Sequence, residues 1–196
     1  WDGTPTQDSR GLDGALDLSA SSARAFIQGP IANSDRSTMA VAARRTYLEG
    51  YFQVMKWANL IDTAFAAPEF NELSARYAFR PDASQRVIVT LLRTGDSLAL
   101  VNSGDDSAIN VEGALELDNK LYMASADYLL APSDELQWQS TVAWTTDRSY
   151  LRRDLGGEQE RTFITHKAYL RSDLTWSPGA HTVQGGVDAS MRQTVA

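Results

Sequence analysis

The stretch from 136 to 145, LQWQSTVAWT, decides the fold class. Large apolar side chains occupy alternate positions of it: Leu136, Trp138, Val142 and Trp144. The positions between them are polar or small: Gln137, Gln139, Thr141, Ala143 and Thr145. Because successive side chains of a strand point to opposite faces, this period of two predicts a strand with one tryptophan-rich face and one polar face.

The same alternation recurs on both sides of this stretch, at 72–80, 163–176 and 182–192. On the apolar face of 163–176 the exceptions are His166 and Ser172. Within 111–131 the apolar positions change from odd to even numbers, which predicts a β-bulge near the middle of that strand. Segments 14–29 and 37–46 are also strand-like. The predicted strand centres are near 18, 41, 75, 90, 125, 141, 169 and 188.

Short turns alternate with long connections along the chain. The short turns fall at 32–35, 81–83, 132–134 and 177–179, and the long connections at 47–67, 94–110 and 147–159. A connection of a few residues joins adjacent antiparallel strands, so each strand is expected to pair with its sequence neighbour. Strands of this length with short turns on one side are typical of an outer-membrane barrel, while a soluble β-sandwich, with shorter strands, stays open as the alternative.

Composition excludes several classes of function. The 196 residues include 18 basic and 25 acidic side chains, a net charge of −7, and no cysteine. No basic run offers a phosphate-binding stripe, so nucleic acid is not an expected partner. A disulfide framework, a thiolate metal site and a cysteine nucleophile are excluded. The longest apolar run, Met39–Ala43, is far too short for a membrane-spanning helix, whereas a membrane-spanning strand needs only about 9 to 11 alternating residues.

Motifs for catalysis and metal binding are missing as well. The sequence contains no phosphate loop, no H-E-x-x-H and no G-x-S-x-G, so we predict no enzyme, no catalytic residue and no cofactor. Asn102, Asp105 and Asp106 offer oxygen ligands but lack the spacing of a calcium loop, so no metal site is predicted. His166 and His181 are read as interfacial residues rather than an active-site pair.

Four local motifs, taken in order, resemble the first third of the barrel of a TonB-dependent outer-membrane receptor. They are Phe26-Ile27-Gln28-Gly29-Pro30-Ile31, Ala43-Arg44-Arg45-Thr46-Tyr47, Pro68-Glu69-Phe70-Asn71-Glu72-Leu73 and Tyr77-Ala78-Phe79-Arg80-Pro81. In that family such a run follows a plug domain and continues into a barrel of 22 strands.

The resemblance implies that residues 1–196 form a partial, all-β, antiparallel up-and-down transmembrane β-barrel of about eight strands, with short periplasmic turns and long extracellular loops, and with no second domain. It implies a receptor of the bacterial outer membrane that imports a scarce nutrient such as a metal chelate. The implied partners are outer-membrane lipid and lipopolysaccharide, a small-molecule ligand, and a TonB-type energy-coupling protein reached through a plug not present here. The alternatives are a self-contained small outer-membrane barrel with a structural or adhesive role and a soluble β-rich binding module.

The alternation also predicts which side chains face lipid and which face the lumen. The outward set is Leu136, Trp138, Val142, Trp144, Leu170, Leu174, Trp176, Val183, Val187 and Met191. Aromatic residues near the short turns are expected to form a periplasmic girdle: Tyr77, Phe79, Tyr128, Trp138 and Trp176. The lumen set is Glu72, Arg76, Lys167, Arg171, Asp173, Asp188 and Arg192.

The ligand prediction rests on arginine and aromatic residues near the long loops. Arginine forks favour carboxylate or phosphate, and aromatic rings offer flat apolar contact, so a mildly anionic, partly planar ligand is expected. The predicted ligand-binding residues are Arg44, Tyr47, Trp57, Arg148, Tyr150, Arg152 and Arg153. Contact of the basic residues in 147–161 with lipopolysaccharide phosphates, or plain solvation of them, is the alternative. Helical spacing of apolar residues in 47–61 predicts a short amphipathic helix that packs against neighbouring loops, with a lid over the mouth as the other reading.

Overall fold

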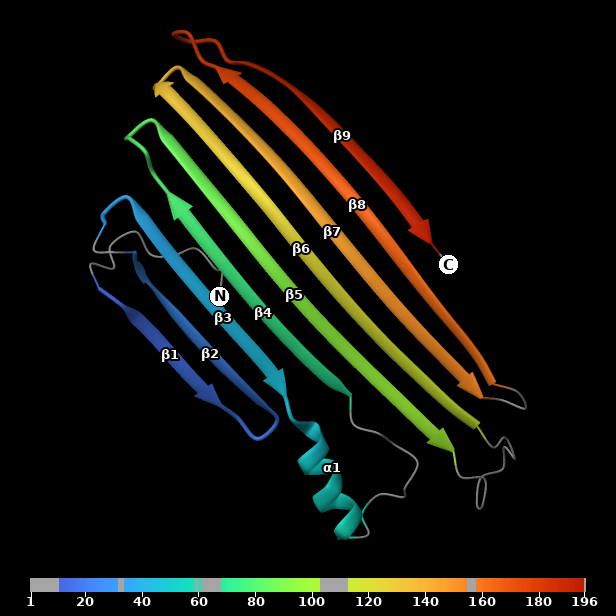
Figure 1. The fold of residues 1–196 in the computed structure, drawn as a ribbon. Coiled ribbons are helices and arrows are strands. Elements are labelled where there is room, and N and C mark those ends of the chain that lie inside the picture. Colours follow the sequence, from blue (N-terminus) through green and yellow to red (C-terminus); the bar gives the residue numbers. More distant parts are fainter. Residues whose placement is uncertain are drawn as a thin grey trace.

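The computed structural model describes residues 11–31, 34–58, 60, 68–102, 113–154 and 158–195. These residues form one sheet of nine antiparallel strands in sequence order, with one helix (Figure 1). The elements are β1 (Asp13–Leu18), β2 (Ser22–Pro30), β3 (Ser37–Thr46), α1 (Leu48–Trp57), β4 (Glu69–Phe79), β5 (Gln85–Asn102), β6 (Gly113–Ser133), β7 (Leu136–Asp154), β8 (Glu158–Trp176) and β9 (Val183–Val195). The predicted all-β, up-and-down arrangement with pairing between sequence neighbours is confirmed.

The two ends of the sheet differ. At one end, here called the short-turn end, β4, β6 and β8 are joined to their successors by short connections (Figure 1). Asp82 organises one of these turns by accepting hydrogen bonds from the Ser84 amide at 2.9 Å and the Gln85 side chain at 2.7 Å. At the other end, the helix end, α1 follows β3, which confirms the helix predicted within 47–61 (Figure 1).

The prediction of one strand near residue 18 is wrong, because residues 13–30 form a hairpin of two strands. A turn of small residues separates β1 from β2: the Ser19 amide donates to the Ser22 carbonyl at 2.9 Å, and the Ser22 amide donates to Ser19 Oγ at 3.0 Å. Serine hydroxyls stabilise turns by bonding to nearby backbone in this way. The sheet therefore has nine strands in the described residues, where about eight were expected.

The predicted position of the bulge, near the middle of 111–131, is also wrong. The pairing of β6 with β5 and β7 runs without a slip as far as Leu130, and the irregularity lies between Leu130 and Ser133, beside the turn. Leu117 and Leu121 consequently lie on the opposite face from Tyr122 and Ala124. The change from odd to even positions is a change in which face of the sheet is apolar.

Two predicted long connections are much shorter than expected. β5 continues to Asn102, so residues 94–102 belong to a strand, and β7 and β8 together take in 147–154 and 158–159. Cross-strand pairs such as Arg152 with Glu160 continue the ladder into this polar region. The turn residues 32–33, residues 103–112 and residues 155–157 lie outside the described part of the chain.

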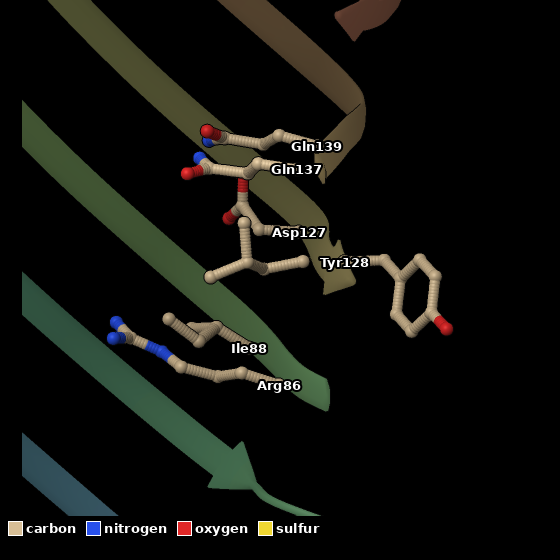
Figure 2. Close-up of a pocket in the computed structure, with 7 residues that line it drawn as sticks. Arg86, Ile88, Asp127, Tyr128, Gln137 and Gln139 are labelled. Carbon is tan, nitrogen blue, oxygen red and sulfur yellow. The ribbon is translucent and has the colours of Figure 1, made fainter. Parts of the chain in front are cut away.

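The register divides the side chains between two faces, because directly paired residues lie on the same face of a sheet. The tryptophan face carries Trp138, Trp144 and Trp176, and the arginine face carries Arg24, Arg44, Arg76 and Arg86. Figure 2 shows the division within one strand: Tyr128 points away from Asp127, which lies on the same side as Gln137 and Gln139. Among the described strands, β1 and β9 are the edges, and the sheet is open rather than closed.

Candidate functional site

The tryptophan face carries an apolar band over the half of the sheet nearest the short turns. Cross-strand neighbours make it continuous from β3 to β9: Met39, Val41, Leu73, Tyr77, Val89, Leu91, Ala126, Val142, Leu170 and Ala189. Many of these side chains have no cover, and Val142 is 48% exposed. A wide, continuous apolar surface of this kind requires an apolar environment or a partner.

Aromatic rings mark both margins of the band on β6, β7 and β8. At the short-turn margin Tyr128 and Trp138 meet edge to face with ring centroids 5.9 Å apart. At the other margin Trp144 stacks on His166 at 5.7 Å. On β7 the band runs from Leu136 to Trp144, a span of nine residues. That span matches the roughly 9 to 11 residues that carry a strand across a bilayer.

The polar side chains inside the band satisfy one another. Trp138 Nε1 donates to Ser172 Oγ at 2.7 Å, and the hydroxyls of Ser140 and Ser172 lie 2.9 Å apart. Both serines interrupt the apolar pattern of the band, and they are direct cross-strand partners. Polar groups paired internally in this way can be transferred to an apolar environment at low cost.

Beyond the band, towards the helix end, the tryptophan face becomes charged. Arg152 Nη2 lies 2.7 Å from Glu158, Lys120 Nζ lies 3.0 Å from Asp118, and the Tyr150 hydroxyl donates to Glu160 at 3.0 Å. The attraction of Glu158 raises the pKa of Arg152, while desolvation and then the hydrogen bond to Glu160 raise the pKa of the Tyr150 hydroxyl. This surface is suited to water or to a layer of charged headgroups.

The arginine face differs from the tryptophan face in where its apolar side chains lie. Near the helix end Leu98, Leu117 and Leu151 are neighbours in one row across β5, β6 and β7, and all three are half-buried. Behind the apolar band the same face is polar: Thr141 donates to Asp127 at 2.6 Å, and Tyr169 donates to Asp188 at 2.9 Å. The arginine face is therefore polar behind the apolar band, and near the helix end its leucine row lies among polar and charged side chains such as Asp96 and Glu72.

The register confirms the predicted division of side chains into two sets. All ten residues of the outward set lie on the tryptophan face: Leu136, Trp138, Val142, Trp144, Leu170, Leu174, Trp176, Val183, Val187 and Met191. All seven of the lumen set lie on the arginine face: Glu72, Arg76, Lys167, Arg171, Asp173, Asp188 and Arg192. The aromatic residues predicted to form a girdle share the tryptophan face near the short turns.

The arginine face also contains a cavity of about 470 Å³ over β1 to β4. Its lining combines two arginines, two acids, one aromatic ring and small residues: Ala15, Asp17, Arg24, Ala25, Phe26, Ala42, Ala43, Arg44, Glu72 and Ser74. We call this cavity the arginine pocket. Asp17, Arg24, Arg44 and Glu72 are successive cross-strand neighbours in a single row.

A second cavity, of about 370 Å³, lies next to the arginine pocket towards the helix end. Phe70, Leu98 and Leu117 line its apolar part, and Asp96 and Asn119, joined by a 2.9 Å hydrogen bond, line its polar part. The cavity drawn in Figure 2, about 220 Å³, lies near the short turns between Arg86, Asp127 and Gln139.

The predicted ligand-binding residues do not form one cluster. Arg44 lines the arginine pocket, whereas Arg148, Tyr150 and Arg152 project from β7 on the tryptophan face. Arg153 lies on the arginine face four strands away from Arg44. The register thus separates Arg152 from Arg153, two residues that the sequence pattern had placed in one loop.

The remaining two members of the predicted set, Tyr47 and Trp57, flank α1. The Tyr47 hydroxyl donates to the carbonyls of Ser19 and Ser22, so it fastens the β1–β2 turn to the end of β3. Trp57 is 87% exposed at the end of α1. Arg24, Phe26 and Glu72 were not predicted as ligand-binding residues; the β2–β3 register places Arg24 beside Arg44, and the β3–β4 register places Glu72 on its other side.

Metal binding finds no support in the described residues, where no three His, Asp or Glu side chains converge. Asp105 and Asp106, considered above as oxygen ligands for calcium, lie outside the described residues, and Asn102 is the last residue of β5. His166 lies in β8 and contacts Trp144 and Thr146 of the neighbouring strand β7, while His181 follows the turn that begins at Ser177. None of the helical residues that the structure describes forms a segment long and apolar enough to cross a membrane.

Comparison of the chain with protein-family models, with curated proteins and with solved structures finds no match.

Proposed function

We propose that this chain is a membrane-embedded segment of a β-barrel in a bacterial outer membrane, with the tryptophan face towards lipid and the arginine face towards the lumen. The carrying observation is the apolar band, which is nine residues long on β7 and has aromatic rings at both margins. A barrel strand requires this length, and amphipathic rings favour the membrane interface. The charged surface beyond the band suits a strand that rises out of the membrane.

The polar face supports the same assignment. If the sheet curls with its arginine face inward, the hydrogen-bonded pairs Thr141–Asp127 and Tyr169–Asp188 line a water-accessible interior. The open edges β1 and β9 then need strands to complete the ring, because lipid cannot satisfy an unpaired strand edge. A soluble β-rich module is the rival, and it would have to cover the whole apolar band with a partner.

Single cysteines offer a sharp test, because the chain has none of its own. Val142 and Thr141 are consecutive in β7 and lie on opposite faces, as do Leu170 and Arg171 in β8. Each is replaced in turn by cysteine in the intact protein in its membrane and labelled with a polarity-sensitive fluorophore. We expect apolar emission at 142 and 170 and aqueous emission at 141 and 171. Aqueous emission at all four positions would contradict the proposal.

We further propose that the parent protein is a receptor that imports a scarce nutrient such as a metal chelate, energised by a TonB-type protein through a plug. The support is the resemblance of four motifs in order, together with a polar face that contains an arginine-lined cavity. Growth of the source bacterium with and without the intact gene tests this, with iron chelates or oligosaccharides as the limiting nutrient. We expect a defect on iron chelates, and a defect confined to oligosaccharides would contradict the ligand class.

A further inference from the structure

We propose that the arginine pocket binds the carboxylate or phosphate group of a small solute, held between Arg24 and Arg44. This inference rests on the proposed function only in taking the arginine face as the side that solutes reach. The pocket is the largest of the cavities described above, at about 470 Å³.

The first step is the position of the two arginines. Arg24 on β2 and Arg44 on β3 are directly paired, and both side chains lie on the arginine face. Directly opposed residues in an antiparallel pair have Cβ atoms about 4.5–5.5 Å apart, and like charges in such positions destabilise the sheet. An anion between the two guanidinium groups would remove that repulsion.

The second step is that no carboxylate of the described residues neutralises either guanidinium group, so both can bind an anion. Asp17 and Glu72 flank the pair in the same row, but among the described residues neither Arg24 nor Arg44 has a carboxylate oxygen within 4.0 Å. Arg44 Nε is buried and has no hydrogen-bond partner in this part of the chain. The Arg44 guanidinium instead lies over the Phe70 ring, 5.4 Å from its centroid. This cation–π contact orients the guanidinium group.

The third step is the room above the row. Ala15, Ala42 and Ser74 line the pocket in the row next to the charged one on the arginine face, and their small size leaves space for a ligand group. A planar guanidinium offers parallel donors that match carboxylate and phosphate oxygens. Asp17 and Glu72 balance the formal charge of the row, so one anionic group is suited to the site and a polyanion is not.

The neighbouring cavity extends the specificity. Phe70 separates the two cavities, since Arg44 covers its ring on one side and it lines the 370 Å³ cavity together with Leu98 and Leu117. A solute with its anionic group between the arginines can place a flat part against Phe26 in the arginine pocket or Phe70 at its margin. The inferred ligand class is therefore a small amphipathic carboxylate or phosphate.

Calorimetric titration of the whole folded protein with benzoate, a flat monocarboxylate, and with inorganic phosphate tests the site. The variants are Arg24→Gln, Arg44→Gln and Arg44→Lys, and the matched control is Arg45→Gln, because Arg45 follows Arg44 but lies on the tryptophan face. We expect each Gln variant to weaken binding about tenfold, Arg44→Lys to weaken it less, and Arg45→Gln to bind as the parent does. Binding should also weaken as salt rises.

The outcomes separate the two ligand chemistries and the two proposals. Binding of benzoate alone identifies a carboxylate site, and binding of phosphate alone identifies a phosphate site. Absence of binding of either probe at millimolar concentration, or equal loss in Arg44→Gln and Arg45→Gln, would overturn the inference. Such a failure would leave the cysteine-labelling result intact, whereas anion binding by a protein whose labels all report water would overturn the membrane proposal alone.

Discussion

Trp144 and His166 stack across β7 and β8 with their ring planes 28° apart. The Thr146 hydroxyl connects them, because it accepts a hydrogen bond from Trp144 Nε1 at 3.2 Å and lies 3.0 Å from His166 Nδ1. The next residue of β7 on the same face is Arg148, where the charged surface begins. A ring system with one apolar side and paired nitrogens is well suited to such a boundary.

The position of these rings predicts a depth profile in the membrane. With single-tryptophan variants in bilayers of brominated lipid, Trp138 and Trp144 should be quenched most by bromine near the headgroups, because they lie at the two margins of the band. A tryptophan introduced at Val142, which lies between them inside the band, should be quenched more by bromine near the chain ends. Quenching that does not depend on bromine depth would contradict a transmembrane band.

A charge placed on each face in turn should have unequal energetic effects. Val142→Arg puts a guanidinium in the middle of the apolar band and should lower the free energy of unfolding by about 2–4 kcal/mol. Thr141→Arg puts the same group on the arginine face near Asp127 and should cost far less. Urea titration of the protein folded in lipid vesicles measures both values, and equal costs would argue for a soluble fold.

Two adjacent glycines in β9 should tolerate alanine very differently. A Cβ at Gly186 would lie 2.6 Å from Asp173 Oδ1 and 2.8 Å from the Ser172 carbonyl oxygen, whereas a Cβ at Gly185 meets nothing within 4 Å. Gly186→Ala should destabilise the β8–β9 hairpin by about 1–3 kcal/mol, the usual cost of overpacking. Gly185→Ala should be neutral or slightly stabilising. Amide exchange in β9 reports both, and similar protection in the two variants would refute the close approach.

The β4–β5 turn should lose stability in acid. Hydrogen bonds from the Ser84 hydroxyl and amide lower the pKa of Asp82 below its ordinary value of 3.8. A carboxylate with a depressed pKa stabilises the fold above its unfolded pKa, and this contribution disappears as pH falls through the folded value. The Asp82→Asn variant should therefore lose stability at neutral pH and show a weaker acid dependence below about pH 4. Asp134→Asn, in the next short turn, serves as the control.

The amphipathic strands were predictable and the polar ones were not. At 136–145 and 163–176 alternation alone gave both the strand and its faces. The stretch 147–154 lacks that alternation because its side chains on the tryptophan face are charged. Arg152 forms ion pairs there with two acids of β8, Glu158 and Glu160. Arginines and acids at matching distances from the turn indicate that the two segments pair as strands. Interpreting 147–159 as a loop overlooked this pattern.

The site was predictable only in part, because it depends on register. Arg44 was chosen for its side chain and its place near a loop, and it does line a cavity. Arg24 lines the same cavity because it is paired with Arg44 across β2 and β3, and these two strand-like segments lack the alternation that would show which side chains share a face. Arg148 and Arg152 were grouped with Arg153 by proximity in sequence, although consecutive side chains of a strand point to opposite faces of the sheet.

The pairing of every strand with its sequence neighbours also governs how the sheet can form. Each new ladder closes over a single connection, the longest being 47–68 between β3 and β4, and because the entropic cost of closure grows only slowly with loop length, that cost stays small. The sheet can consequently grow by adding strands in chain order, with the unpaired edge of the last strand acting as the template for the following one. In such stepwise growth, a defect in one turn delays every strand that comes after it while leaving the earlier strands paired.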